Sequence, residues 1–347
     1  MTRRIDYQCE EGYTIRFATV DDIDKIMIFI KAHWKSTHIL ANDRSFFEYE
    51  FLHGQEVTFV LLVDEKTNKI EGTLGYIPYS KNDLRDMFTV VWKVLNSTDV
   101  FRGVALMNYL VDHGKCRNIY SSGINPNTRS IYKYMGYKVT YLQHYYRLTE
   151  RSNYKIAKIK HINILPVETT EYNLQEVYDF IEMEQKIELW KSEAYPYKDA
   201  VYIEKRYFRH PIYQYRIFSI QRGKNTVGTY LIMREIEING TKIIRVVDVL
   251  GEKAYIQYIG ASINALLEKE QFEYIDFYQY GIEEENMNKA GFVLREKHDV
   301  NIIPNYFEPF LQENVEIGIF FEKELCPYIF KADGDQDRPS IWYGERL

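Results

Sequence analysis

Cysteine is scarce in this sequence, with 3 residues in 347, at Cys9, Cys116 and Cys326. An odd number of cysteines at wide spacings argues against a disulfide framework and against a cysteine-rich zinc site. None of the three stands in a recognisable nucleophile motif. We therefore expect three reduced thiols without a catalytic role.

An excess of positive charge is also missing. The chain has 44 lysines and arginines against 50 aspartates and glutamates, which gives a formal net charge of −6. A protein that binds phosphate backbones needs a basic surface, and this balance does not supply one. Nucleic acid is therefore not an expected partner.

Long apolar runs are the third absence. The start, Met1-Thr-Arg-Arg-Ile-Asp6, is not followed by the apolar core of a signal peptide. No apolar run approaches the roughly 18 residues of a membrane span. We expect a cytoplasmic protein that does not associate with membranes. A hydrophobic share of 46% and a charged share of 27% are typical of a globular protein, and 347 residues favour two domains.

The first half of the chain shows the periodicity of a mixed α/β domain. Stretches rich in β-branched and aromatic residues alternate with stretches whose apolar residues recur at helical spacing. The predicted order is β-α-β-β-β-α-β-α. Its strands are expected at 13–18, 56–64, 70–79, 88–95 and 118–122, and its helices at 20–31, 104–113 and 127–135.

The second half repeats this order from about residue 172, with a predicted helix over 174–190 and a hairpin over 213–233. Two short stretches support a duplication: 46–54 resembles 202–210, and 135–139 resembles 290–294. A repeat of roughly 150 residues gives two related domains and not a solenoid. We predict an N-terminal domain over 1–150, a linker over 151–172, a C-terminal domain over 173–325, and a tail over 326–347 that folds toward the active-site cleft.

The most specific stretch is Asn125-Pro-Asn-Thr-Arg-Ser-Ile-Tyr-Lys-Tyr-Met-Gly-Tyr137. It has a capping asparagine, a proline at the first helical position and a glycine stop. This stretch and the element order resemble the GNAT superfamily of acyl-CoA-dependent acyltransferases. The resemblance implies two GNAT-like domains in tandem. In that family the central strands splay to admit the pantetheine arm, and a helix N-terminus takes the pyrophosphate.

The resemblance also implies roles for individual residues. Tyr132 corresponds to the phenol that protonates the departing thiolate, and Asn125 to the matching loop position. The pyrophosphate loop corresponds to Arg102, Gly103, Val104 and Ala105. The fit is imperfect, because Ala105 and Met107 stand where the family has small residues that permit close approach of the backbone.

The second half fits the phosphate pattern better and the catalytic pattern worse. Gln257, Gly260 and Ser262 match the phosphate loop, but Met287 and Tyr280 occupy the tyrosine and asparagine positions. Methionine cannot donate a proton. We expect the reacting centre in the first half. Because Gln257 and Gly260 match the phosphate loop, CoA binding by the second half stays an alternative.

The region that lines the acceptor pocket in GNAT folds contains His33, Trp34 and His38. A histidine near neutral pKa suits a general base for an ammonium acceptor, so His38 or His33 is the predicted base, with Trp34 in the acceptor pocket. The alternative is a helix end with a packed indole and exposed histidines. A zinc site is not expected, because the histidines are five apart and no third ligand is near.

The C-terminal stretch Lys331-Ala-Asp-Gly-Asp-Gln-Asp-Arg-Pro-Ser340 places aspartates at alternate positions. It lacks the glycine and glutamate spacing of a calcium loop. A frayed acidic end is one interpretation. The other assigns Asp333, Asp335 and Asp337 to an amine or hydroxyls of the acceptor, and Arg338 to a nucleotide phosphate.

Together these stretches resemble tandem GNAT enzymes that N-acylate nucleotide-linked amino sugars for surface polysaccharides. The resemblance implies transfer of an acetyl or 3-hydroxybutyryl group from acyl-CoA to a sugar such as a dTDP-3-amino-3,6-dideoxyhexose, without a metal. Two alternatives stay open: an inactive tandem GNAT fold that binds ligands as a scaffold, and an aminoacyl-tRNA-dependent peptidyl transferase. Whether the chain forms a homodimer is also open.

Overall fold

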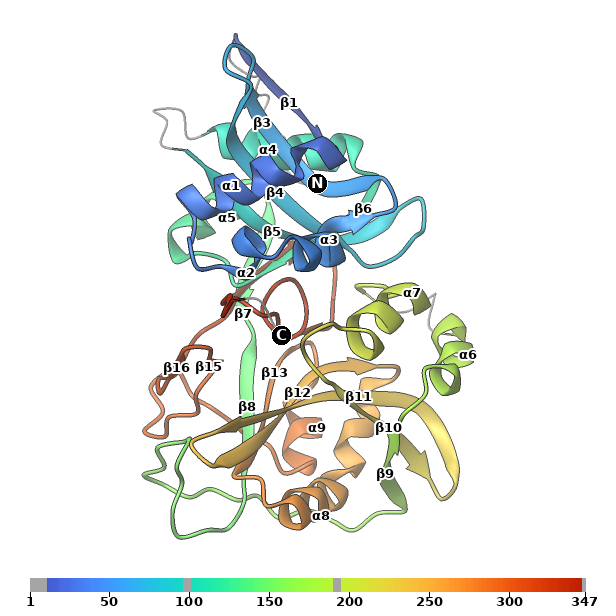
Figure 1. Ribbon diagram of the computed structural model, residues 1–347. Helices are drawn as coiled ribbons and strands as arrows, with labels where there is room; N and C mark the ends of the chain where they lie inside the picture. The colour runs from blue at the N-terminus through green and yellow to red at the C-terminus, as the bar shows by residue number, and fades with distance from the viewer. Residues whose placement is uncertain (1–10, 96–100, 190–194, 345–347) are drawn as a thin grey trace. The chain divides into compact units, whose positions relative to one another are not determined.

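The computed structural model describes residues 11–95, 101–189 and 195–344, and these form two compact units (Figure 1). The first unit takes Met1–Thr140, Gly318–Leu325 and Gly334–Leu347. The second takes Tyr141–Ile317 and Cys326–Asp333. Each unit is thus built from segments that are distant in the sequence.

The first unit contains a sheet in the order β1-β3-β4-β5-β6-β17-β7, with β2 paired to β3. Its strands are β1 (Tyr13–Ala18), β2 (Leu52–His53), β3 (Glu56–Asp64), β4 (Lys69–Pro78), β5 (Arg85–Val94), β6 (Cys116–Ser122), β7 (Tyr137–Tyr141) and β17 (Gly318–Glu322). Its helices are α1 (Ile23–His33), α2 (Ile39–Asn42), α3 (Arg44–Phe51), α4 (Phe101–His113) and α5 (Arg129–Tyr134).

Alternation along β3 explains how helices cover both faces of this sheet. Val60 and Leu62 join the apolar cluster formed with residues of α4 and α5. Phe59 points to the other face, where its ring packs against Phe47 and Phe51 of α3. Because successive side chains of a strand point to opposite faces, a strand that is apolar throughout must be covered on both sides.

The second unit contains a sheet in the order β14-β8-β13-β12-β11-β10-β9, with β18 paired to β13. Its strands are β8 (Gln143–Leu148), β9 (Tyr172–Val177), β10 (Arg216–Arg222), β11 (Asn225–Ile238), β12 (Thr241–Leu250), β13 (Tyr274–Tyr280), β14 (Val293–Leu294) and β18 (Ile329–Phe330). Its helices include α6 (Ile181–Leu189), α7 (Ala200–Ile203), α8 (Gly260–Glu270) and α9 (Glu284–Lys289), and β15 (Tyr306–Phe307) and β16 (Phe310–Leu311) form a separate ribbon.

The two sheets have the same strand order, and the predicted mixed α/β fold with a tandem arrangement is confirmed. The predicted helix over 174–190 is wrong at its start, because Tyr172–Val177 forms β9. This strand pairs with β10, with Leu174 opposite Ile220. The local sequence pattern suits a helix as well as a strand, and the pairing with β10 decides for the strand. Helix α6 begins only at Ile181, and Trp190 lies outside the described residues.

Each sheet takes one strand from the far end of the other repeat. Strand β8 follows β7 in the chain but pairs with β13 in the second sheet. Strand β17 follows the second repeat but pairs with β6 in the first sheet. The predicted domains, 1–150 and 173–325, contain no such exchange. Both strands are short and largely buried, so the sequence pattern does not tell which sheet receives them.

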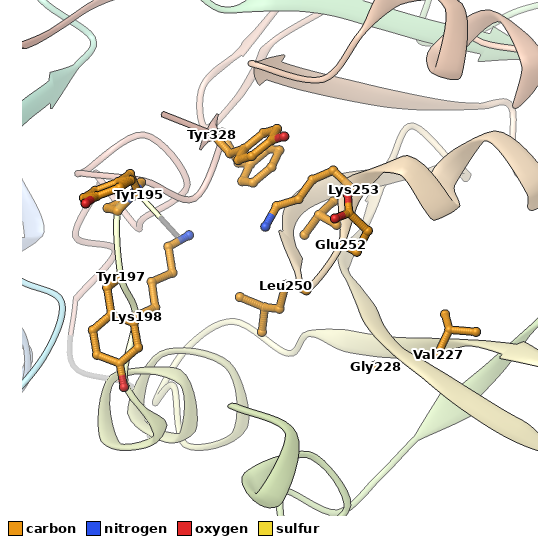
Figure 2. Close-up of a pocket in the computed structure, with 13 residues that line it drawn as sticks. Tyr195, Tyr197, Lys198, Val227, Gly228, Leu250, Glu252, Lys253 and Tyr328 are labelled. Atoms are coloured by element: carbon orange, nitrogen blue, oxygen red, sulfur yellow. The ribbon is translucent and has the colours of Figure 1, made fainter. Parts of the chain in front are cut away.

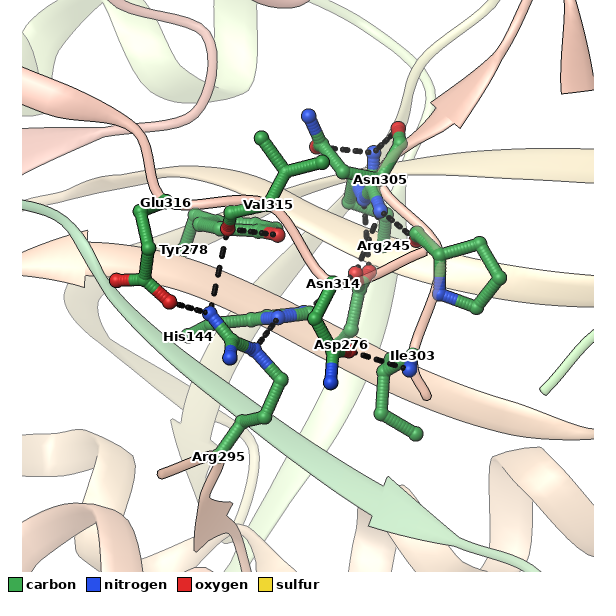
Figure 3. Close-up of polar contacts among 11 residues, drawn as sticks. His144, Arg245, Asp276, Tyr278, Arg295, Ile303, Asn305, Asn314, Val315 and Glu316 are labelled. Atoms are coloured by element: carbon green, nitrogen blue, oxygen red, sulfur yellow. Dashed lines mark hydrogen bonds and ion pairs between the residues drawn. The ribbon is translucent and has the colours of Figure 1, made fainter. Parts of the chain in front are cut away.

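A buried ionic network holds the incoming strand β8 in the second sheet (Figure 3). The His144 Nε2 atom lies 3.0 Å from Asp276, whose carboxylate also accepts two bonds from Arg245, at 2.6 and 2.8 Å. Arg295 Nε donates to His144 Nδ1 at 3.0 Å. Nδ1 is therefore an acceptor and Nε2 carries the proton, which is the neutral imidazole. Burial lowers the pKa of His144 to about 4, in agreement with this tautomer.

Candidate functional site

The parallel strands β5 and β6 of the first unit stop pairing before either ends. Their ladder runs from Arg85 opposite Cys116 to Phe88 opposite Tyr120, whereas β5 continues to Val94. Beyond this point hydroxyls bridge the strands: Thr89 Oγ1 donates to the Tyr120 carbonyl at 3.3 Å, and Ser121 Oγ donates to the Thr89 carbonyl at 3.0 Å. Side chains thus replace the backbone ladder where the strands separate.

A strained bulge follows in β5. Val91 has a φ of +46°, and the register between β4 and β5 shifts at this point. A β-branched residue in the left-handed region is an outlier that costs of order 1–3 kcal/mol, and such strain gathers at functional sites. Bulges beside active sites turn backbone groups out of the ladder. The bulge at Val91 is therefore a candidate for a ligand-binding element of this sheet.

Trp92 lies directly after the bulge and fills the space between α4 and α5. A Cβ on Gly103 of α4 would stand 3.2 Å from its ring, and its centroid lies 5.4 Å from that of Tyr132 in α5. Tyr132 is buried and stacks on Phe320 of β17 at 4.2 Å. The Tyr132 phenol is protonated at neutral pH, and burial raises its pKa further. It is able to donate a proton.

The residues assigned to phosphate binding lie at the start of α4. Arg102 forms an ion pair with Glu71 at 3.1 Å, and its guanidinium stands over the Tyr13 ring. Val104 and Ala105 lie in the first turns of α4, and both are buried. Asn125 is exposed, and its side chain accepts a bond from the Asn127 backbone at 2.9 Å as an N-cap. Residues 96–100, which precede α4, lie outside the described part of the chain.

The predicted acceptor-pocket residues lie where α1 ends and α2 begins. His38 caps α2, since its Nδ1 accepts from the Leu40 backbone at 3.2 Å, and its ring stacks on Trp34. Burial, followed by the charge of Lys35, lowers the pKa of His38 to about 4. The imidazole is therefore neutral at physiological pH, with Nδ1 occupied. His33 is exposed and contacts Phe29.

The C-terminal stretch is folded and largely buried, in two different environments. Within the first unit, Gly334 N–H donates to the Tyr79 hydroxyl at 2.9 Å, and Gly334 lies near Phe88 and Ser122. Arg338 forms an ion pair with Glu50 of α3. Asp335 is partly buried beside Gln336, and Asp337 is buried. Farther on, His38 forms a β-bridge with Ile341. The structure thus brings His38 and Trp34 close to this stretch, whereas Tyr132 packs in the cluster of α4 and α5.

The corresponding gap in the second unit is filled by the chain itself. Strands β12 and β13 pair only as far as Val246 opposite Phe277, and the bulge in β12 follows at once at Val247. Strand β18 pairs with the end of β13. The Ala332 N–H then donates to the Val247 carbonyl at 2.8 Å. The segment therefore forms the backbone contacts that a ligand inserted between the two strands would make.

The start of α8 is covered as well. A Cβ on Gly260 would stand 2.6 Å from Val167 and 3.0 Å from the Ala290 carbonyl. Thr170 donates to the Tyr258 carbonyl at 2.8 Å, which holds this connecting segment in place. Met287, at the tyrosine position of the second repeat, is buried in the core. Gln257 bonds within its own turn to Ala254.

Asp333 belongs to a buried charge cluster in the second unit. Lys198 Nζ lies 2.5 Å from Asp248 and 2.8 Å from Asp333. The hydroxyl of Tyr207 also donates to Asp248, and the Phe330 backbone donates to Asp333 at 2.7 Å. Burial raises the pKa of Asp333 despite the ammonium beside it. Two carboxylates thus share one ammonium, and Asp333 anchors the segment that fills the gap.

A cavity of about 320 Å³ lies next to this cluster (Figure 2). It is formed by the end of β12, the turn that follows, the segment before α7, and β18. Its lining is mainly apolar and aromatic with two lysines and one glutamate: Tyr195, Pro196, Tyr197, Lys198, Val227, Gly228, Val249, Leu250, Gly251, Glu252, Lys253, Tyr328 and Phe330. The volume is at the lower end of the range for ligand pockets, about 300–1,000 Å³.

Sequence reasoning did not identify Lys198, Asp248 or Lys253. One signal was present for Asp248: it interrupts the apolar run Val246-Val-Asp-Val-Leu250 in a strand buried on both faces. A lone carboxylate in such a strand needs a partner. Nothing in the local sequence points to Lys198, which precedes a short helix far from β12.

Two kinds of feature are absent from the described residues. Between residues 11 and 344, outside the two undescribed gaps, no group of three or more histidine, cysteine, aspartate or glutamate side chains is placed to hold a metal ion. Over the same described residues, no helix is long and apolar enough to cross a membrane.

No protein-family model matches the sequence, and no characterised protein matches it by sequence. Solved structures do match the fold. A GCN5-related N-acetyltransferase from Anabaena variabilis superposes with a TM-score of 0.56 at 11% identity, covering 88% of this chain and 72% of that one. A conserved protein of unknown function from Enterococcus faecalis, described as a probable N-acyltransferase, gives 0.55 at 10% identity with the same coverages. At these identities the likeness establishes a GNAT-like fold.

Proposed function

We propose that the chain is an acyl-CoA-dependent N-acyltransferase whose donor site lies in the first unit. The observation that carries this proposal is the strained bulge at Val91 in β5, at the point where β5 and β6 separate. In the second unit the equivalent gap is occupied by β18 and Ala332. The GNAT-like fold of the structural neighbours supports the same reading of the sheet.

The residues of the first unit fit a thioester donor. The end of the β5–β6 pair, where the ladder has stopped, would offer strand backbone groups to an extended chain, and α4, the next helix of the chain, would add its N-terminal dipole. Acyl-CoA would supply the activated acyl group. Backbone N–H groups at the bulge would stabilise negative charge on an acyl oxygen. Gly103 and Trp92 would set the width of the slot.

Tyr132 is the proposed proton donor. Its phenol is protonated at neutral pH, burial raises its pKa further and so makes it a weaker acid, and the ring is held between Trp92 and Phe320. The thiolate that leaves when the carbon–sulfur bond breaks would take this proton. His38 remains the proposed base for the amine, with His33 as the alternative. A pKa of about 4 keeps His38 unprotonated but makes it a weak base, which limits its share of the catalysis.

For the acceptor we propose the amino group of a nucleotide-linked amino sugar. The support is the sequence resemblance, together with the position of the C-terminal stretch. Gly334 lies against the face of β5 and β6 that carries Phe88 and Ser122. Met87 points to the opposite face, into the cluster of α4 and α5. The stretch with Asp335 and Asp337 would therefore form a wall on the acceptor side of the proposed slot.

The test is release of free thiol from acetyl-CoA or 3-hydroxybutyryl-CoA with a panel of dTDP- and UDP-amino sugars. We expect turnover with at least one pair, and at least a tenfold lower kcat for Tyr132→Phe with little change in CoA affinity. Calorimetry should give one CoA per chain. CoA binding without turnover on any acceptor would favour a ligand-binding scaffold, and two CoA molecules per chain would contradict the assignment of the donor site.

A further inference from the structure

The cavity of the second unit is lined by an ammonium group, that of Lys253. Lys253 follows Glu252 in the turn after β12, and its side chain reaches into the cavity (Figure 2). Its Nζ stands 4.8 Å from the centre of the Tyr328 ring. Among the residues that the structure describes, no acidic side chain forms an ion pair with Lys253. The second lysine of the lining, Lys198, is already paired with Asp248 and Asp333.

The remainder of the lining suits a flat, largely apolar body. Tyr195 and Tyr328 present aromatic rings, and Val249, Leu250 and Phe330 are buried apolar residues beside them. Close packing of Gly251 against Gly228 forms part of the wall: a Cβ on Gly251 would stand 2.2 Å from the Gly228 carbonyl, and its φ is +86°. A side chain at Gly251 is therefore excluded, and the space beside β12 stays open.

We propose that this cavity binds a phosphate-bearing small molecule of about mononucleotide size, with the phosphate on Lys253 and a planar ring against Tyr328 and Tyr195. The ammonium lies over the Tyr328 ring, and no described carboxylate stands within ion-pair distance of it, so an oxyanion can pair with it directly in a partly enclosed site. A planar ring gains stacking with the tyrosines. The volume of about 320 Å³ is in the range that a mononucleotide would fill and is smaller than a whole coenzyme A.

All residues of the cavity lining belong to the second unit, so none of them is shared with the donor site proposed in the first. Its affinity should depend on pH. Burial lowers the pKa of Lys253 to about 8. The charged groups that face it are Glu252, Lys198, Asp248 and Asp333, and the ring of Tyr328 lies against it. A bound phosphate favours the protonated ammonium, so affinity should fall as pH rises from 7 to 9.

The experiment measures binding of thymidine monophosphate and of thymidine to the full chain, by calorimetry or ligand-observed NMR, at pH 7 and pH 9. We expect the nucleotide to bind at least tenfold more tightly than the nucleoside. Lys253→Ala should weaken nucleotide binding at least tenfold, whereas Lys224→Ala, an exposed lysine in the β10–β11 turn, should leave it unchanged. Lys253→Arg should keep the affinity and lose the fall at pH 9, because arginine stays charged.

Lys253→Arg also controls for misfolding, since it keeps the charge and most of the side-chain volume. Wild-type affinity in Lys253→Ala would overturn the proposal. Equal affinity for nucleotide and nucleoside would overturn the role of the phosphate, and with it the proposed ligand class. Absence of binding at millimolar nucleotide would overturn the site. None of these results decides whether the first unit transfers acyl groups, which the thiol-release assay tests separately.

Discussion

The two sheets of this protein share a strand order but differ at the end of their parallel strand pair. In the first, β5 and β6 part after Phe88, three positions before the bulge at Val91, and neutral hydroxyls bridge them. In the second, β12 and β13 stay paired up to the bulge at Val247, and the chain's own residues then fill the gap. In the first repeat the strands stop pairing ahead of a strained bulge, whereas the second repeat is closed at this point by its own chain.

The two sheets also differ in the polar residues that lie opposite each other on their parallel strands. In the first sheet Asp86 lies opposite Asn118 and also bonds to the partly exposed Arg117. In the second sheet Arg245 lies opposite Asp276, and both are fully buried with His144. Fully buried ions need complete partner sets, because an unpaired buried charge costs several kcal/mol. The free energy of unfolding should therefore fall most when a single charge is lost from the closed repeat.

Loss of Asp276 should have the largest effect. Asp276→Ala leaves Arg245 without its carboxylate and His144 without an acceptor. We expect the free energy of unfolding to fall by about 3–5 kcal/mol in urea denaturation followed by circular dichroism. Glu237→Gln, an exposed carboxylate on β11, is the control and should change it by less than about 0.5 kcal/mol. A small loss for Asp276→Ala would mean that water enters this network.

The pH dependence of stability should report on His144. Its pKa is about 4 in the folded chain against 6.5 for the free side chain, so the unfolded chain binds more protons between these values. Stability should therefore be retained above pH 6.5 and lost as pH falls toward 4, by about 3 kcal/mol. His144→Gln should flatten this window relative to wild type, and the exposed His161→Gln should not. An unchanged slope in His144→Gln would place the titration elsewhere.

Removal of the Asp333 side chain tests what holds the segment 329–333, which occupies the gap between β12 and β13. Asp333→Ala leaves the Phe330 N–H without its acceptor and Lys198 with one carboxylate. We expect a loss of about 1–3 kcal/mol in the free energy of unfolding. Asp333→Asn keeps an oxygen for the Phe330 N–H and should lose less. Equal losses in the two variants would show that the charge, and not this backbone bond, fixes the segment.

The smallest effect is expected at the open end of the first sheet. Thr89→Val removes the hydroxyl that donates to the Tyr120 carbonyl at 3.3 Å and keeps the side-chain shape. A loss of about 0.5–1.5 kcal/mol is expected in the same urea experiment. Thr67→Val, in an exposed turn, serves as the matched control. A loss above about 3 kcal/mol would contradict the description of this pair as loosely bridged.

The sequence was sufficient to predict the mixed α/β pattern and the duplication, because these rest on periodicity and on turn residues such as Pro126 and Gly136, but it missed strand β9 at Tyr172–Val177. It did not reveal the exchange of β8 and β17, since a short apolar strand carries no mark of the sheet that it joins. The cluster of Lys198, Asp248 and Asp333 also escaped prediction, because long-range folding alone brings these residues together. The roles of Tyr132 and His38 stay predictions, and the structure supplies their surroundings.

The strand exchange also has a consequence for the order of assembly. Strand β17 begins at Gly318, so the first sheet lacks one of its inner strands until nearly the whole chain has been synthesised. A fragment that stops at residue 150 would leave β6 and β7 without the strand that joins them, and would carry β8 with no sheet to enter. Neither repeat is therefore expected to fold as a separate module, although the chain looks like a simple duplication.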